Sequence, residues 1–238
     1  MTHEARSWIG TADIVLHLVP DPVGESLIDR LSAGRNRSLR RHYDEHSNRR
    51  DAYEAMVVEI IDVVRDGHTA CAAFYGHPGV FSLVPRMAIE RARDEGFAAT
   101  MSPGISAEDC LFADLLVDPA DSGLITYEAT DYLINKRVVD PTTGLVLWQI
   151  GKLAVFEPGD RTSSSEAKRA LVGKLAEHYP TGHRVVLYEA ATLPGEPPAI
   201  TELALNDLPA ESTHAGHTLY IPPAEPARAD PRFRSYRP

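Results

Sequence analysis

Residues 69–79, TACAAFYGHPG, decide the class of fold, because an unbroken apolar run is followed at once by two glycines. Strands that are buried on both faces of a parallel sheet carry such continuous apolar runs. Helical periodicity predicts one helix over residues 51–66, before this stretch, and another after it that ends near residue 95. Strands are predicted at residues 12–19 and 97–101. This alternation is typical of an α/β domain.

The second half of the chain is richer in predicted strands, so we expect a mixed sheet there. Strands are predicted near residues 124–127, 145–150, 184–190, 199–205 and 218–221, with one helix near 164–179. The expected organisation is an N-terminal α/β domain over residues 1–116, a linker at 117–123, a C-terminal domain over 124–223 and a mobile tail at 224–238.

Composition excludes several classes of protein. The chain has 238 residues, of which 43% are hydrophobic and 24% charged, as in globular proteins. Its net charge of −10 argues against a general nucleic-acid binder. No apolar run is long enough for a membrane helix and no signal sequence is recognisable, so we expect a cytoplasmic protein. Cys71 and Cys110 are expected to be reduced and buried, and Trp8 and Trp148 to lie in the core.

Two loops that contain glycine follow predicted strands. The segment 75–79 is either a plain tight turn or a loop that lets a ligand approach the backbone closely. The segment 103–109 breaks the next strand, and Ser106 there is placed to cap a short helix. Ligands of α/β proteins bind beyond the carboxyl ends of parallel strands, so the two loops are candidates for lining one crevice.

Residues 42–46, HYDEH, fit the H-x-x-E-H pattern of one class of zinc proteases. That hypothesis makes His42 and His46 metal ligands and Glu45 the base, and it needs a third ligand on another helix, which the sequence does not identify. A solvated, charged segment is the favoured interpretation, so no metal is predicted.

Arg49 and Tyr53 are four residues apart, so they share one helix face if the helix begins early. That face continues into the apolar positions 57, 60 and 61, which directs both side chains toward the protein. Either they are an amphipathic pair at the edge of the core, or the guanidinium favours the phenolate and lowers the pKa of the tyrosine.

Three longer strings carry a family resemblance: AFYGHPGVFSLVPRMAIERARDEGF, SPGISAEDCLFADLLVDP, and TYEATDYLI with LVLWQIG. Over about residues 4–223 the chain resembles the tetrapyrrole methylase superfamily of S-adenosylmethionine enzymes. Within it, SAEDCLFADL, YEATD and WQ are similar to borosin-type peptide backbone α-N-methyltransferases. The resemblance implies a class III methyltransferase fold of two α/β domains, with the methyl donor in the cleft between them.

The resemblance also implies a set of site residues. Residues that match donor-binding motifs are Tyr75, His77, Val80, Ala107, Gln149, Ala190, His217 and Thr218, and His217 stands where a serine is expected. The catalytic cluster of the family matches Tyr43, Arg49 and Tyr53, while Arg40 falls where a further tyrosine is usual.

These residue types suit transfer to a peptide amide, whose nitrogen lone pair is delocalised. The amide must lose its N–H proton while negative charge builds on it. A tyrosine base helped by an arginine meets the first need, and an arginine with a second phenol that donates to the carbonyl oxygen meets the second.

The resemblance implies a homodimer, S-adenosylmethionine as donor and S-adenosylhomocysteine as product. The tail AEPARADPRFRSYRP has no apolar core peptide, so the expected substrate is a separate precursor peptide, as in split borosins. The alternatives are a corrinoid or porphyrin precursor methylase, whose polycarboxylate substrate suits the arginines of residues 30–50, and a non-catalytic relative.

One element of the superfamily is missing from the expected pattern. The sequence MTHEARSWIGTADIVLHLV matches the family from its first helix onward, so the strand and glycine-rich turn that precede this helix are not found. A start codon assigned too late is the favoured explanation, and a chain that has lost part of its donor site is the other.

Overall fold

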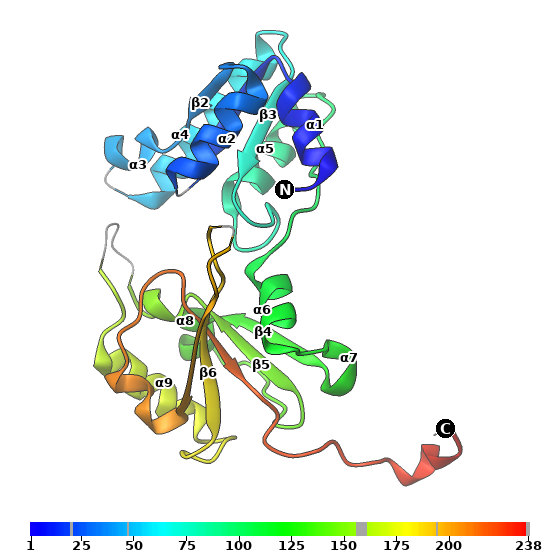
Figure 1. Cartoon of the computed structure of the whole chain (residues 1–238), viewed down its shortest axis with the longest axis vertical. Coiled ribbons are helices and arrows are strands. Elements are labelled where there is room, and N and C mark those ends of the chain that lie inside the picture. The colour runs from blue at the N-terminus through cyan, green and yellow to red at the C-terminus, as the bar shows by residue number, and fades with distance from the viewer. Residues whose placement is uncertain (20, 47, 156–160, 194, 237–238) are drawn as a thin grey trace. The chain divides into compact units, whose positions relative to one another are not determined.

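The computed structural model describes residues 1–19, 21–46, 48–155, 161–193 and 195–236 (Figure 1). The chain divides into two compact units, Met1–Asp109 and Cys110–Pro238. The division falls inside helix α6 (Ala107–Leu115), whereas the linker expected at residues 117–123 contains the short helix α7 (Pro119–Ser122). The domain boundaries derived from the sequence stay a prediction.

The first unit holds a three-stranded parallel sheet in the order β2-β1-β3. The strands are β1 (Ile14–Leu18), β2 (Asn36–Ser38) and β3 (Ala70–Phe74). The helices that end before residue 95 are α1 (His3–Thr11), α2 (Pro22–Ser32), α3 (Arg41–Glu45), α4 (Arg49–Arg65) and α5 (Leu83–Asp94). The predicted strands at 12–19 and 69–75 and both predicted helices are therefore confirmed.

The alternation of side chains along β1 places apolar residues on both faces of this sheet. Leu16 packs in a cluster with Met56 of α4 and Val84 of α5. Val15 packs on the other face with Ile9 of α1 and Ile28 of α2. The sheet is thus covered by two helices on each face, which explains why β1 and β3 are mainly apolar without alternation.

Several expectations for the first half are wrong. Residues 97–101 form no strand, because β3 is the last strand of its sheet and pairs only with β1 among the described residues. Trp8 is 47% exposed rather than in the core, since it faces outward on α1. Cys71 and Cys110 form no disulfide and are only half-buried, and desolvation raises the pKa of Cys71 to about 11.

The second unit holds a five-stranded mixed sheet in the order β4-β5-β8-β6-β7, as the sequence predicts. Only β4 and β5 pair in parallel, and the other neighbours are antiparallel. The strands are β4 (Leu124–Glu128), β5 (Gly144–Trp148), β6 (Arg184–Glu189), β7 (Ala199–Ala204) and β8 (Thr218–Ile221). The helices are α8 (Ala129–Ile134), α9 (Ser165–Leu175) and the 3-10 helices η1 (Ile150–Lys152), η2 (Leu205–Ala210) and η3 (Pro231–Tyr236).

The core of this unit lies between the sheet and helix α9, where Leu171 and Leu175 pack against β5 and β6. Trp148 is buried at the end of β5, as expected. In the described residues no helix is long and apolar enough to span a membrane.

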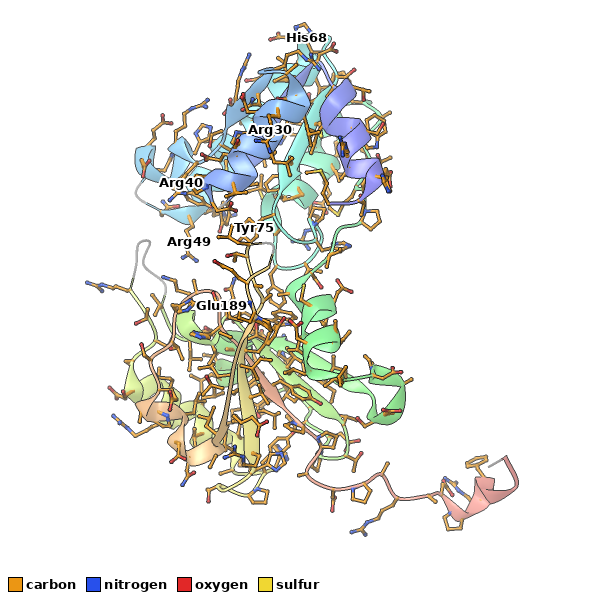
Figure 2. All side chains as sticks on the ribbon, in the orientation of Figure 1. Arg30, Arg40, Arg49, His68, Tyr75 and Glu189 are labelled. Atoms are coloured by element: carbon orange, nitrogen blue, oxygen red, sulfur yellow. The ribbon has the colours of Figure 1, made fainter. Side chains whose placement is uncertain are left out.

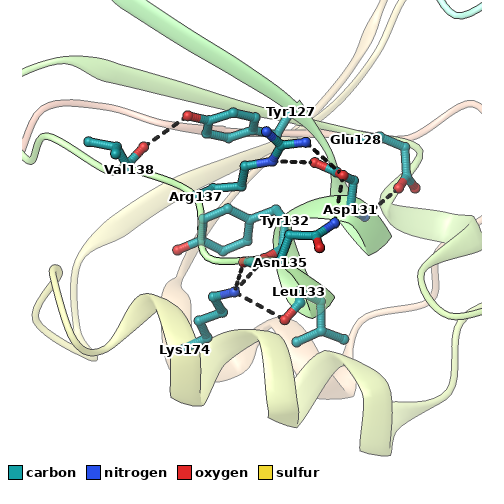
Figure 3. Close-up of polar contacts among 9 residues, drawn as sticks. All are labelled: Tyr127, Glu128, Asp131, Tyr132, Leu133, Asn135, Arg137, Val138 and Lys174. Atoms are coloured by element: carbon teal, nitrogen blue, oxygen red, sulfur yellow. Dashed lines mark hydrogen bonds and ion pairs between the residues drawn. The ribbon is translucent and has the colours of Figure 1, made fainter.

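The YEATD motif has a local structural role in this unit (Figure 3). The Glu128 carboxylate accepts a hydrogen bond from the Asp131 N–H at 2.6 Å and so caps α8. Asp131 in turn binds Arg137 through two hydrogen bonds of 2.7 and 2.8 Å. The Lys174 ammonium of α9 donates to the Tyr132 carbonyl and two other carbonyls at the end of α8, which ties the two helices together. The motif therefore begins α8, which Lys174 then holds against α9.

Candidate functional site

The structure brings together the two glycine loops that the sequence singles out. A Cβ atom built on Gly104 would lie less than 3.0 Å from the Gly76 carbonyl oxygen and 3.1 Å from the His77 Cα atom. A side chain at position 104 would therefore collide with backbone, which explains why glycine stands there. Both loops lie at the carboxyl end of β3, where ligands of α/β proteins bind.

Hydrogen bonds fix the shape of both loops. The Gly79 N–H donates to His77 Nδ1 at 3.0 Å and the Val80 N–H donates to the His77 carbonyl at 3.0 Å. In the second loop, the Ser106 hydroxyl and N–H both donate to the Asp109 carboxylate, at 2.8 and 2.7 Å. These bonds, with the positive charge that His77 takes on when protonated, hold the pKa of Asp109 below its usual value. Ala107 follows Ser106 as the first residue of α6, as the capping prediction requires.

The proposed catalytic residues lie together in the first unit. Helix α4 begins at Arg49, early enough for Arg49 and Tyr53 to share a face. The Tyr43 ring of α3 meets the Tyr53 ring edge-on, with centroids 6.2 Å apart. Tyr75, at the start of the first glycine loop, is 66% exposed and close enough to raise the pKa of Tyr43. One residue of the predicted donor set therefore adjoins the tyrosines.

Tyr43 is 39% exposed, so only part of its side chain is desolvated by the surrounding residues. Desolvation raises the pKa of its phenol well above the usual value, and the neighbouring Tyr53 and Tyr75 raise it further. Arg49 acts in the opposite direction, but it does not offset these effects. Tyr43 therefore keeps its proton at neutral pH and is equipped to donate a hydrogen bond rather than to accept a proton.

Sequence reasoning missed how helix α3 is held. The buried His42 ring makes a 2.8 Å contact from Nε2 to the Glu59 carboxylate of α4, and Arg41 pairs with the same carboxylate at 2.8 Å. His42 Nδ1 lies 3.3 Å from Glu45. Because a helix of five residues is not stable alone, these contacts position Tyr43 against α4.

The H-x-x-E-H segment does gather its potential ligands, since one atom each of His42, Glu45 and His46 lie within 4.8 Å of one another. His46 Nδ1 is hydrogen-bonded to the His42 carbonyl at 2.9 Å, and His42 is engaged by Glu59. These engagements give the segment a structural role, and the zinc hypothesis stays open to metal analysis.

Four further donor-set residues meet at one edge of the second sheet. Gln149 follows β5, Ala190 follows β6, His217 immediately precedes β8 and Thr218 begins it. Because β8 runs antiparallel to both neighbours, its start lies at the same edge as the ends of β5 and β6. Gln149 has a left-handed backbone with φ of +57°, which is unusual for a residue with a long side chain and is often seen at functional sites.

A histidine network at this edge was not predicted. The carboxylate of Glu189, which is labelled in Figure 2, lies 3.1 Å from His214 Nε2. The backbone N–H of His214 donates to His217 Nδ1 at 3.0 Å, and the backbone N–H of Gly216 donates to His214 Nδ1 at 3.3 Å. One ligand-type atom each of Glu189, His214 and His217 lie within 4.8 Å. Both Nδ1 atoms already accept backbone hydrogens, which places the ring protons on Nε2 and opposes metal binding there.

Fold and site define the class of protein. A uroporphyrin-III C-methyltransferase of Thermus thermophilus superposes on the chain with a TM-score of 0.67 and 19% identity, covering 94% of this chain and 88% of its own. A cobalt precorrin-4 methyltransferase superposes with a TM-score of 0.63 and 14% identity, covering 95% and 90%. At these identities the likeness shows the fold, which is that of the class III methyltransferases.

The chain belongs to the tetrapyrrole (corrin/porphyrin) methylase family, whose model matches residues 1–205. Its curated relatives include the methyltransferase/type I borosin cyclic peptide precursor of Cerrena unicolor, 36% identical over 98% of this chain, and the methyltransferase/omphalotin A precursor of Omphalotus olearius, 38% identical over 94%. The chain spans 58% and 54% of the length of these two relatives. The resemblance to borosin methyltransferases is thereby confirmed.

Proposed function

We propose that the chain is an S-adenosylmethionine-dependent methyltransferase that N-methylates backbone amides of a precursor peptide. The observation that carries this proposal is the cluster of Tyr43, Arg49 and Tyr53 beside Tyr75, which opens the glycine loop of the predicted donor set. Methylation of a tetrapyrrole carbon has no need of two phenols and a guanidinium at this position. Membership of a methylase family and borosin relatives support the same conclusion.

The residues present fit a sulfonium donor. Tyr75, His77 and Val80 lie in or beside the first glycine loop after β3, and Ala107, in the second, begins α6. The family resemblance assigns Gln149, Ala190, His217 and Thr218 of the second unit to the same donor-binding set. The donor supplies an electrophilic methyl group, and S-adenosylhomocysteine would be the product.

The remaining chemistry belongs to the side chains of the first unit. Tyr53 is the proposed base for the amide proton, with Arg49 stabilising the negative charge that develops. Tyr43, which keeps its proton, donates to the amide carbonyl oxygen as charge builds on it. This proposal gives the two phenols separate roles: Tyr53 accepts the amide proton, and Tyr43 donates a hydrogen bond to the carbonyl oxygen.

The substrate, its mode of delivery and the assembly are part of the proposal. The relatives carry the precursor in the same polypeptide as the methyltransferase, as their names state. Delivery as a separate peptide, a homodimer and a cytoplasmic location stay predictions. A second candidate, methylation of a corrinoid or porphyrin precursor, is favoured by the arginines of residues 30–50, which suit a polycarboxylate.

A mass-spectrometric assay tests the proposal. The protein is incubated with S-adenosylmethionine and a synthetic peptide with an apolar Val/Ile-rich core, and in parallel with uroporphyrinogen III. We expect mass shifts of one methyl group or more on the peptide, located on backbone nitrogens by fragmentation. Methylation of the tetrapyrrole alone would contradict the peptide proposal, and binding of the donor without any transfer would favour a non-catalytic relative.

A further inference from the structure

Four arginines within residues 37–50, the stretch that also contains Tyr43, form what we call the arginine cluster: Arg37, Arg40, Arg49 and Arg50. Arg37 lies on β2, Arg40 immediately precedes α3, and Arg49 and Arg50 are the first two residues of α4. All are exposed except Arg49, which is half-buried. They occur within one short stretch of a chain whose net charge is −10.

No side chain of the arginine cluster forms an ion pair or hydrogen bond with a residue that the structure describes. Other arginines of the first unit do find such partners: Arg41 pairs with Glu59 at 2.8 Å, Arg65 with Asp62 at 2.8 Å, and Arg91 with Glu54 at 2.6 Å. The chain has 34 acidic residues against 24 basic ones, so carboxylates are not scarce. In the described part of the chain, these four side chains therefore carry positive charge without a counter-ion.

Two carboxylates of the same stretch are engaged elsewhere. Glu45 faces His42, and Asp51 accepts a 2.6 Å hydrogen bond from Asn48. Arg49 and Arg50 moreover stand in the first turn of α4, where the helix dipole disfavours cations. Cations that stand at a helix N-terminus without a counter-ion are expected where function requires them.

The cluster adjoins the candidate site, since Arg49 acts on Tyr43 electrostatically. In Figure 2 the labelled Arg40 and Arg49 lie with Tyr75 at the end of the first unit opposite His68. We propose that the arginine cluster binds an acidic segment of the substrate peptide, one rich in Asp or Glu that flanks the methylated stretch. This inference rests on the proposed peptide methyltransferase function and adds the chemistry by which the peptide is recognised.

Arginine suits this role because its planar guanidinium binds carboxylates through two parallel hydrogen bonds. The acidic remainder of the protein repels such a peptide, so the attraction is local and must weaken as salt shortens the screening length. Binding would thus hold the peptide in place while its apolar part meets the tyrosines.

The test changes two arginines that have no proposed part in the chemistry. One double variant combines Arg37→Glu with Arg50→Glu. The matched control combines Arg86→Glu on α5 with Arg6→Glu on α1, which changes the net charge by the same amount away from the cluster. A glutamate at position 50 suits the start of α4, so the double variant is expected to fold with an unchanged or higher Tm. Thermal unfolding of each variant verifies this.

Two probe peptides share one Val/Ile-rich core and differ only in the flanks, which carry five glutamates in one and five glutamines in the other. Calorimetry in the presence of S-adenosylhomocysteine measures their Kd at low and at physiological salt. We expect the glutamate peptide to bind the native protein about tenfold tighter at low salt, as two or more exposed ion pairs imply. The preference should shrink with salt and in the Arg37/Arg50 variant, but not in the control.

Equal affinity for the two peptides, or a preference that survives in the Arg37/Arg50 variant, would overturn the proposal. If the glutamine peptide is nevertheless methylated, the proposed function stands and only the acidic recognition fails. If uroporphyrin binds through Arg37 and Arg50 while neither peptide binds, the cluster serves a polycarboxylate tetrapyrrole, and both proposals fail together.

Discussion

Gly104→Ala tests the closest approach between the two glycine loops. The added methyl group would lie less than 3.0 Å from the Gly76 carbonyl oxygen, a separation that real Cβ atoms essentially never show. The obstacle is backbone rather than the end of a flexible side chain, so one loop must move. Overpacking of this kind costs about 1–3 kcal/mol, and we expect that loss in the free energy of unfolding.

The same displacement bears on donor binding if the loops hold the donor. If the whole overpacking cost of about 1–3 kcal/mol destabilises the loop conformation that binds the donor, the Kd for S-adenosylhomocysteine rises by about 5- to 150-fold. Isothermal calorimetry measures the Kd, and urea unfolding measures the stability of the same preparation.

Gly10→Ala provides the control within the same unit. Gly10 lies in α1, and the nearest atom to its added Cβ is the Leu31 carbonyl oxygen at 3.7 Å, an ordinary contact. Alanine is the better helix former, so this variant should gain about 0.5–1 kcal/mol in stability and bind the donor product as before. If Gly104→Ala loses stability but keeps the native Kd, the loops are plain turns; if it loses neither, the close approach itself is refuted.

Three further outcomes are expected. Tyr53→Phe is expected to abolish peptide methylation, and near-normal turnover of this variant would refute the assignment of the base. Tyr43→Phe is expected to lower kcat by about 10²–10³-fold, as the loss of one oxyanion donor does, and to keep the pH dependence of the base. Mass spectrometry over a pH series measures both effects. Asp109→Asn destabilises the protein at pH 7, and because the pKa of Asp109 is lowered in the folded state, the difference from native disappears as the pH falls below about 4 in urea titrations. Treatment with EDTA leaves peptide methylation unchanged; a loss that zinc restores would instead support a metal site at residues 42–46.

The sequence predicts the elements of this fold well wherever one segment carries its own signal. The apolar run at residues 70–74 and the glycines after it mark β3 and its loop without any help from the rest of the chain. The segment 97–101 has a similar apolar pattern, yet it forms no strand, because a strand also needs a hydrogen-bonding neighbour. A local pattern reports the preference for extended backbone but not the presence of that neighbour.

For the candidate site too, the sequence indicates individual residues but not the contacts between distant segments. Tyr43 and Tyr53 were found through a resemblance, but the contact that positions Tyr43 was not, since His42 and Glu59 are seventeen residues apart and lie on two helices. No periodicity marks a helix as short as α3. The meeting of Gln149, Ala190 and Thr218 likewise depends on the pairing order of β5, β8 and β6, which the spacing of residues along the chain does not contain.

The roles of the two phenols depend on desolvation, which is a property of three-dimensional packing. Sequence spacing pairs Arg49 with Tyr53 and leaves open whether the guanidinium lowers the pKa of that phenol. Around Tyr43 the structure adds burial and two neighbouring phenols, and together they outweigh Arg49 and raise its pKa. A proton that stays on Tyr43 is the one that an amide oxygen needs as negative charge builds. We therefore propose Tyr53, on the same helix face as Arg49 and in contact with the Tyr43 ring, as the base.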